Sequence, residues 1–241
     1  MSEKVIPTVI PKKAKRRVIS SDNVVLVPYL DEHVPRYNKW MQDPSILSLT
    51  GSEPLSLEEE YDMCRQWKED NEKITYILLS PSVDEGADAQ SANAEAADAK
   101  SPTTTDGSSK TRQWVVDRLD RMVGDANLFL SVCEELGDNG ELVSSVFEAE
   151  LEVMVAEPSA RRGGIATQAC RILIGEAFGL GVERVFVKIK DGNDGSRKLF
   201  EKLGFALVRY VECFGETEME LKAPLPTDPG VVFSDYIEPH T

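Results

Sequence analysis

A glycine-rich turn between a strand-like run and a helical pattern constrains this chain more than any other feature. The turn covers residues 161–166 (Arg-Arg-Gly-Gly-Ile-Ala), after the strand-like run 151–156 and before an apolar helical pattern. Adjacent glycines let the backbone approach a ligand closely. The first N–H groups of a helix have no intrahelical partner and lie at the positive end of the helix dipole. The turn is therefore predicted to bind an anion such as a pyrophosphate group.

Composition and charge limit the size of the domain and the classes of partner and substrate that such a turn could belong to. The chain has 241 residues, 41% of them hydrophobic, which is enough for a substantial core in one large domain or two small ones. Its formal net charge of −15 argues against a nucleic acid partner and favours a cationic substrate. The one basic cluster, at 12–17, lies in a predicted disordered tail over 1–22. That tail is a localisation or anchoring signal, or only a solvated arm.

Cysteine and histidine are too sparse to suggest a disulfide framework, a metal site or a Ser-His pair. The cysteines are Cys64, Cys133, Cys170 and Cys213, and the only histidines are His33 and His240. We expect reduced, mostly buried thiols and no metal. Neither a signal peptide nor an apolar stretch of about twenty residues is present. We therefore expect no membrane partner and a location in the cytoplasm, with the nucleus as the alternative.

The apolar periodicity predicts one α+β domain over residues 23–222. Strands are predicted at 24–27, 73–79, 121–130, 147–155, 185–189, 205–211 and 217–221. Helices are predicted at 33–41, from Ser56 onward, at 165–178 and at 193–203. Ser56 and Glu59 have the spacing of a capping box, which marks a helix start.

Two stretches lack the large apolar residues that a core needs. Residues 81–112 are rich in Ala, Ser, Asp, Thr and Gly, so they are predicted to form a disordered acidic insertion in the domain. Residues 223–241 are predicted to be a Pro-rich, acidic C-terminal tail. The sequence shows no internal repeat and no second core.

The turn fits neither of two common nucleotide sites. The Walker pattern Gly-x-x-x-x-Gly-Lys-Ser/Thr is absent, and a dinucleotide fold would place its glycines after the first strand, whereas this turn follows four strands. It resembles instead the Arg/Gln-x-x-Gly-x-Gly/Ala motif of the GNAT superfamily of acetyl-CoA-dependent N-acetyltransferases. A second motif of that family, an Asn ahead of a helix ending in Lys-x-Gly-Phe, is matched by Asn193, Ser196, Leu199, Lys202, Gly204 and Phe205.

Two further runs, at 52–61 and 152–159, are similar to the eukaryotic N-acetyltransferase nine-like group, which is related to bacterial acetylases of ribosomal protein N-termini. The resemblance implies a mixed, mostly antiparallel sheet that splays between its fourth and fifth strands and is flanked by about four helices. It also implies acetyl-CoA as co-substrate, with the pantetheine arm in the splay. The residues it implies for CoA binding are Met154, Val155, Arg161, Arg162, Gly163, Gly164, Ile165, Ala166, Thr167, Asn193 and Phe200.

The reaction, attack of an amine on a thioester, needs a group that takes a proton from the amine. Glu148, Glu150 and Glu152 alternate along the fourth strand and therefore share one face. Like charges at this spacing raise one another's pKa toward useful basicity. We select Glu150 first and Glu152 second as catalytic base. The alternative interpretation is a solvated outer face of a half-exposed strand.

The general acid stays open, because many family members carry a Tyr where this chain has Phe200. Candidates from elsewhere are Tyr29, Tyr37, Tyr61 and Tyr76, and water can also protonate the leaving thiolate. Substrate choice is expected in the segment 33–67, with Glu53 and Tyr61 as binding residues and carboxylates that attract a cationic amine.

The predicted activity is transfer of an acetyl group to a protein N-terminal α-amine or Lys. The resemblance also makes tubulin a candidate partner, which nothing in the residues themselves indicates. Two alternatives remain at this point: a catalytically idle module that binds CoA or a protein, and an acetyltransferase for small polyamines. The oligomeric state is left open.

Overall fold

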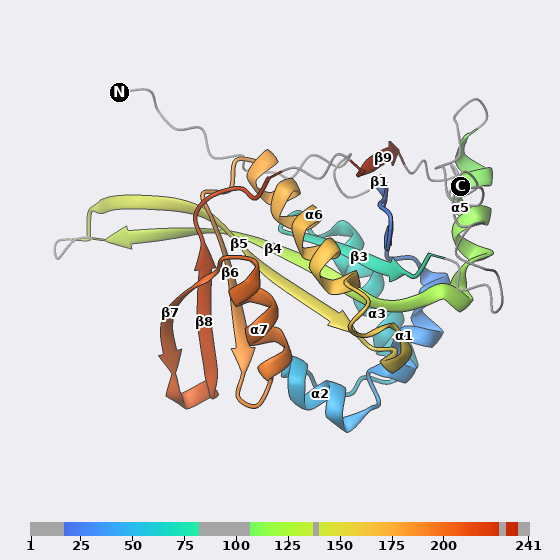
Figure 1. The fold of residues 1–241 in the computed structure, drawn as a ribbon, viewed down its shortest axis with the longest axis horizontal. Helices are drawn as coiled ribbons and strands as arrows, with labels where there is room; N and C mark the ends of the chain where they lie inside the picture. The colour runs from blue at the N-terminus through green and yellow to red at the C-terminus, as the bar shows by residue number, and fades with distance from the viewer. Residues whose placement is uncertain (1–16, 82–106, 137–139, 227–229, 236–241) are drawn as a thin grey trace.

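A computed structural model describes residues 17–81, 107–136, 140–226 and 230–235. Nine strands form one sheet in the order β7-β8-β6-β5-β4-β3-β2-β1-β9. They are β1 (Arg17–Ser20), β2 (Val25–Pro28), β3 (Lys73–Leu79), β4 (Met122–Leu136), β5 (Leu142–Val155), β6 (Arg184–Lys190), β7 (Ala206–Val211), β8 (Glu216–Leu221) and β9 (Val232–Asp235). Each described pairing is antiparallel except that of β5 with β6 (Figure 1).

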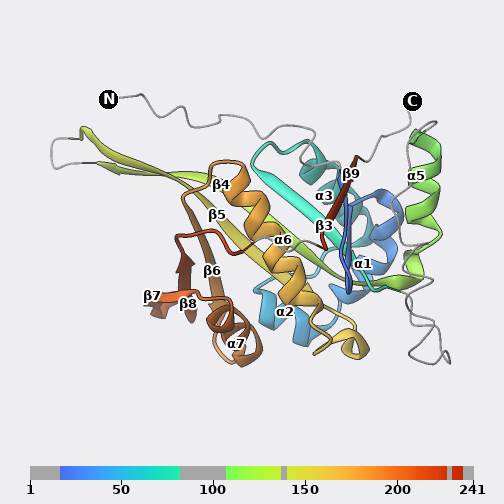
Figure 2. The same cartoon turned by 45° about the horizontal axis from the view of Figure 1, so that its top comes forward.

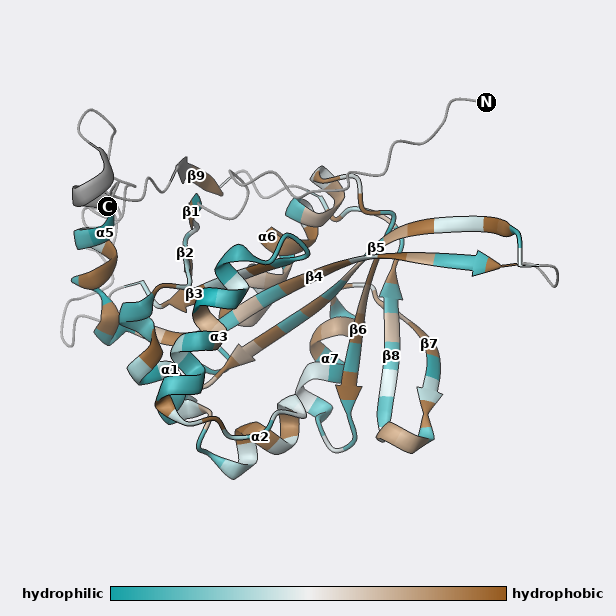
Figure 3. Cartoon of the chain, turned by 180° about the vertical axis from the view of Figure 1, so that it is seen from behind, coloured by the Kyte–Doolittle hydropathy of each residue, from teal (hydrophilic) through white to brown (hydrophobic). Residues whose placement is uncertain are grey.

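Helices cover both faces of the sheet. They are α1 (Val34–Trp40), α2 (Pro44–Thr50), α3 (Leu57–Glu69), α5 (Gly107–Val116), α6 (Ile165–Gly179) and α7 (Asp194–Lys202). Figure 1 shows α6 and α7 in front of the sheet, and Figure 3 shows α1 and α3 on the opposite face. Two hydrophobic cores result, one under α6 and α7 and the other under α1, α2 and α3.

The sheet opens between β5 and β6. These strands pair in parallel only from Glu148 to Glu150, opposite Arg184 to Phe186. Beyond that point β5 continues to Val155 beside β4 and β6 runs on beside β8, so the two strands diverge (Figure 1). The mixed, mostly antiparallel sheet with a splay between these two strands confirms the predicted fold.

The capping box at the start of α3 is also confirmed. The Ser56 hydroxyl accepts a hydrogen bond from the Glu59 backbone N–H, and the Glu59 carboxylate accepts one from the Ser56 N–H. Every predicted strand and helix has a counterpart, with bounds close to those expected except in the β4–β5 hairpin, where β4 ends at Leu136 rather than at 130 and β5 starts at Leu142 rather than at 147. The exceptions are additions, because the structure holds elements where none was predicted.

Four additions correct the sequence prediction. Six α-helices are described rather than about four, and the unpredicted α2 starts at Pro44, behind Asp43 as N-cap. β1 lies in the region assigned to the N-terminal tail and β9 in the C-terminal tail, where they pair with each other (Figure 2). Such four-residue strands are too short to show a period. Part of the predicted disordered insertion, 107–112, belongs to α5, which carries Val115 into the core under α1–α3. Residues 1–16, 82–106 and 236–241 lie outside the described residues.

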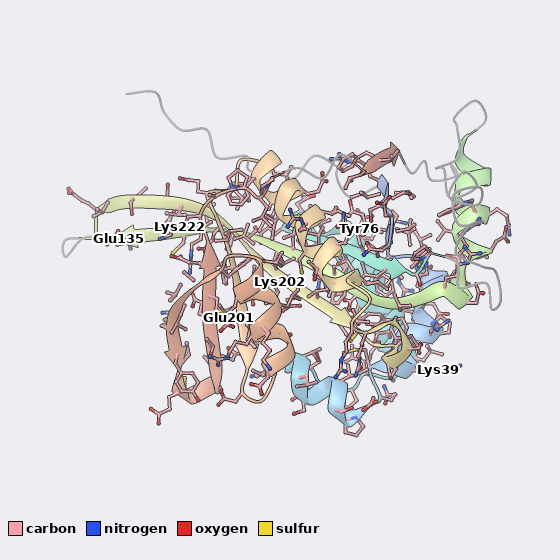
Figure 4. All side chains as sticks on the ribbon, viewed as in Figure 1. Lys39, Tyr76, Glu135, Glu201, Lys202 and Lys222 are labelled. Carbon is pink, nitrogen blue, oxygen red and sulfur yellow. The ribbon has the colours of Figure 1, made fainter. Side chains whose placement is uncertain are left out.

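The hairpin of β4 and β5 extends beyond the rest of the sheet as a two-stranded arm, on which Glu135 is labelled in Figure 4. Cys133 lies exposed on this arm and Cys213 is exposed near β7, so only Cys64 and Cys170 fit the expectation of buried thiols. Among the described residues, no helix is both long and apolar enough to cross a membrane.

Candidate active site

The glycine-rich turn forms an uncapped helix start. Gly164, the N-cap of α6, has a φ of 83° and Arg162 a φ of 66°, both in the left-handed region. No side chain caps this helix, and its first backbone bond runs from the Gln168 N–H to the Gly164 carbonyl. The N–H groups of Ile165, Ala166 and Thr167 therefore have no acceptor within the helix. A Cβ at Gly163 would meet only the Ala160 carbonyl oxygen, at 3.7 Å, so the backbone here is open to a ligand. These features suit a pyrophosphate group.

Arg161 forms structural contacts that the sequence did not indicate. Its guanidinium turns back to the end of β5, where Nε donates to the Val155 carbonyl at 2.9 Å and Nη2 to the Ala156 carbonyl at 3.0 Å. The side chain thus fixes the turn that leads from β5 to α6. Val155 is one of the residues predicted to bind CoA, and a ligand bonded to its carbonyl would share that oxygen with Arg161. Met154, also predicted to bind CoA, lies opposite Asp125 of β4.

Asn193 and Phe200 have structural roles on α7. The Asn193 Oδ1 accepts from the Ser196 N–H at 3.1 Å and so caps the helix, which leaves the Nδ2 group for another acceptor. Phe200 is 3% exposed and lies edge-on against Phe205, with ring centroids 5.1 Å apart. A side chain held inside the core in this way does not face a ligand at the surface. The burial of Phe200 therefore argues against the predicted contact of its ring with CoA.

The three carboxylates of β5 lie in different surroundings although they share one face. Glu148 is buried and paired with Arg184, which also binds Glu218 and Glu220 of β8. Glu150 is paired with Lys188 of β6, whose Nζ lies 2.7 Å from the carboxylate. Glu152 lies beyond the last position of β5 that pairs with β6, and its side chain forms no ion pair or hydrogen bond with any described residue. The structure therefore favours Glu152 over Glu150 as a base, which reverses the predicted order.

Glu152 is exposed, yet the protein around it displaces much of the water that would hydrate its charge. This desolvation, together with the charges of Glu150 and Asp125, raises the pKa of Glu152 to about 7. The ammonium of Lys73 on β3 and that of Lys188 oppose the rise. A carboxyl group with this pKa is divided between its acid and base forms near neutral pH, which suits general acid-base chemistry.

A buried polar network lies on the same face of the sheet, toward α1 and α3. Asp125 is 3% exposed, and burial raises its pKa to about 6. It accepts hydrogen bonds from Asn127 Nδ2 at 2.7 Å and from the Tyr37 hydroxyl at 3.3 Å. The Tyr29 hydroxyl donates to Glu60 of α3 at 3.4 Å. Asp125, Asn127 and Lys73 were not predicted as site residues, and the only signal for them in the sequence was the alternation of Asp125 and Asn127 in an otherwise apolar strand. Glu60 belongs to the carboxylates expected in the segment 33–67.

The tyrosines proposed as general acid divide between the two faces. Tyr29 and Tyr37 lie in the core under α1–α3, on the side of Glu152, and burial raises the pKa of both hydroxyls. Tyr76 is buried in the other core, under α6 (Figure 4), and is therefore separated from Glu152 by the sheet. Tyr61 on α3 is half-buried against the core under α1–α3.

Glu53 is exposed in the loop between α2 and α3, and its side chain forms no hydrogen bond or ion pair with the described residues of the site. No cluster of three metal-binding side chains occurs in the part of the chain that the structure describes.

The splayed sheet, the uncapped turn before α6 and the carboxylates of β5 together define an acetyltransferase of the GNAT class. Comparison of the sequence with family models agrees, because the model described as "Acetyltransferase (GNAT) domain" matches residues 80–206. The chain belongs to this family and is an N-acetyltransferase that uses acetyl-CoA, as the family does.

Curated relatives match most of the chain. An "N-acetyltransferase 9-like protein" of Caenorhabditis briggsae is 40% identical over 205 residues, which cover 84% of both chains. The human "Alpha/beta-tubulin-N-acetyltransferase 9" is 38% identical over 202 residues, which cover 82% of this chain and 79% of the human protein.

Solved structures share the fold at low sequence identity. A spermidine N-acetyltransferase from Vibrio cholerae, solved with CoA and spermine, superposes with a TM-score of 0.54 and 12% identity, over 86% of this chain and 95% of that one. The microcin C7 self-immunity acetyltransferase MccE, solved with acetyl-CoA and AMP, gives a TM-score of 0.52 and 11% identity, over 84% of this chain and 93% of that one.

Proposed function

We propose that this N-acetyltransferase modifies a protein amine, either an N-terminal α-amine or a Lys side chain, and that tubulin is a candidate acceptor. The relatives from human, mouse and Drosophila melanogaster carry the name "Alpha/beta-tubulin-N-acetyltransferase 9". The net charge of −15 also favours a cationic acceptor over an anionic one. The single observation that carries the proposed chemistry is Glu152, the carboxylate of β5 that no cation neutralises by direct contact.

In this proposal Glu152 takes a proton from the acceptor ammonium, directly or through a water molecule. The free amine nitrogen then forms a bond to the acetyl carbonyl carbon and the carbon–sulfur bond breaks. The second proton that the nitrogen loses as the amide forms passes to the departing thiolate, directly or through water. Acetyl-CoA supplies the activated acyl group. The chain supplies N–H groups at the start of α6 for the pyrophosphate and the unpaired edge of β5 beyond Glu150 for the pantetheine arm.

The test is release of free CoA thiol by wild type, Glu152→Gln and Glu150→Gln with three acceptor classes: tubulin N-terminal peptides, internal Lys peptides and spermidine. We expect turnover with one of the two peptide classes. Loss of a general base typically lowers the rate by about 10²–10⁴-fold, so we expect a loss of this order for Glu152→Gln. Glu150→Gln, which changes the same functional group one period along the strand, should lose about tenfold or less.

Three outcomes would contradict the proposal. Full activity of Glu152→Gln would remove its assigned role, and turnover with spermidine but with neither peptide class would replace the protein acceptor by a polyamine. Tight binding of CoA without turnover of any acceptor would favour a binding module. Thermal melts of both variants verify that each protein is folded.

A further inference from the structure

Lys73 is a buried cation held by aromatic rings rather than by an ion pair. It is the first residue of β3 and is 3% exposed. Its Nζ lies 2.9 Å from the centroid of the Trp67 ring of α3 and 4.1 Å from that of Phe129 of β4. No carboxylate among the described residues forms an ion pair or hydrogen bond with it. The faces of two aromatic rings attract a cation and hold this ammonium in place.

Lys73 and Glu152 lie on the same face of the sheet, two strands apart. Lys73 is opposite Phe129 of β4, which is opposite Glu150 of β5, and Glu152 is two residues further along the same strand. Side chains two positions apart along a strand point to the same side. The ammonium of Lys73 is thus directed to the face that carries Glu152, and the charges of Glu152, Asp125 and Asp70 act on it.

The charged groups around Glu152 come from four strands. Asp125 of β4 and Glu150 of β5 are acidic and favour its protonated form, whereas Lys73 of β3 and Lys188 of β6 favour its carboxylate form. Lys188 is in direct contact with Glu150 at 2.7 Å, so its charge is largely balanced by that partner. Lys73 has no such partner, and its charge is available to Glu152.

We propose that Lys73 is a positioning residue that keeps Glu152 in its carboxylate form, and that Trp67 and Phe129 hold the ammonium where no carboxylate neutralises it by contact. This inference rests on the proposed function, in which Glu152 must be ionised to accept a proton. Without the cation, the remaining acidic neighbours would leave more of Glu152 protonated at neutral pH. Lys73 itself does not need to touch either substrate.

The test compares Lys73→Met, which keeps the apolar stem between the two rings, with wild type. The carboxyl carbon of Glu152 is followed by NMR against pH in protein labelled with ¹³C-glutamate, and its signal is assigned with Glu152→Gln. We expect the titration midpoint of the Glu152 carboxyl group to rise in Lys73→Met on the order of one pH unit. The acid limb of kcat/KM should move by the same amount, which gives a loss of about fivefold at pH 7 that disappears at high pH.

Two variants separate this effect from simple damage. Lys73→Arg keeps the charge and should keep the wild-type midpoint. Lys190→Gln removes one positive charge from the same face of β6, where Lys190 is paired with Glu216, and should leave the Glu152 midpoint unchanged. Lys73→Gln replaces Lys73→Met if melting shows that the Met variant does not fold.

The outcomes distinguish this inference from the proposed function. An unchanged Glu152 midpoint in a folded Lys73→Met protein, or an equal shift in Lys190→Gln, overturns the role of Lys73. A shifted titration midpoint together with full activity of Glu152→Gln would instead confirm that the charge of Lys73 acts on Glu152 and overturn the role of Glu152 as base.

Discussion

At the scale of single residues, the environment of a side chain decides its role more than its type does. Glu148, Glu150 and Glu152 are chemically identical and lie on one face of β5, yet Arg184 and Lys188 neutralise the first two. Glu152 lies where β6 has diverged and receives no such partner. The sequence could place the three carboxylates on one face. The cations that pair with the first two come from β6, 36 and 38 residues further along the chain.

Gly124 shows how one residue can determine the packing of two strands. It lies opposite Val155, and a Cβ at this position would overlap the backbone carbonyl oxygen of Met154. Because backbone atoms cannot rotate away, we expect Gly124→Ala to lower the free energy of unfolding by about 3 kcal/mol. Urea denaturation measures this change.

Gly175 provides the matched control for that substitution. It lies on α6, is exposed, and a Cβ there meets nothing within 4 Å. Gly175→Ala should raise stability by about 0.5–1 kcal/mol, since Ala loses less backbone entropy than Gly in a helix. Equal effects of the two substitutions would show that the close approach at Gly124 does not limit the packing of β4 on β5.

At the scale of elements, local signals fixed the start of α3 but not the existence of α2. The capping box of α3 is a pattern of side chains within four residues, so it is visible in the sequence. α2 has seven residues and buries only Ile46, which is too little for a periodic signal. Its position is fixed by tertiary contacts: Ile46 packs into the core under α1–α3, and Gly51, the C-cap of α2, lies beside the Lys190 side chain of β6.

The capping box gives a prediction at this scale. Ser56→Ala removes the acceptor of the Glu59 N–H and the hydroxyl that binds the Glu59 carboxylate at 2.7 Å. We expect a loss of about 1 kcal/mol in the free energy of unfolding, measured by urea denaturation. Ser48→Ala, on the exposed face of α2, should change stability by about 0.5 kcal/mol or less. A similar loss at both positions would contradict a specific role of the cap.

At the scale of the whole molecule, the stability of the fold depends on buried titratable groups from several elements. Burial lowers the pKa of His33 to about 3, so the unfolded chain binds the extra proton and stability falls as the pH drops from about 6.5 toward 3. The contribution of Asp125 to stability changes with pH in the opposite direction. Its pKa is raised to about 6 by burial, so stability falls as the pH rises from about 4 to 6 and the carboxylate becomes charged.

Asp125→Asn isolates the second effect, because the amide oxygen can still accept the hydrogen bonds from Asn127 and Tyr37. The difference in unfolding free energy between variant and wild type should shift in favour of the variant by about 2 kcal/mol between pH 4 and 7, and then stay level. The contribution of His33 cancels in this difference. Urea denaturation of both proteins at several pH values measures it, and a difference that does not change with pH would contradict ionisation of a buried Asp125.

The sequence by itself determined the strands and helices with a clear period, the glycine-rich turn before α6, and a fold class that the splay between β5 and β6 confirms. These features depend on residues close together in the chain. Only the tertiary structure decided that Arg161 binds the end of β5, that Phe200 belongs to the core, and that Glu152 rather than Glu150 lacks a cation partner. It also placed the ammonium of Lys73 against the rings of Trp67 and Phe129. The physical reason is that burial and charge pairing depend on neighbours from distant strands, and one sequence pattern is compatible with many such arrangements.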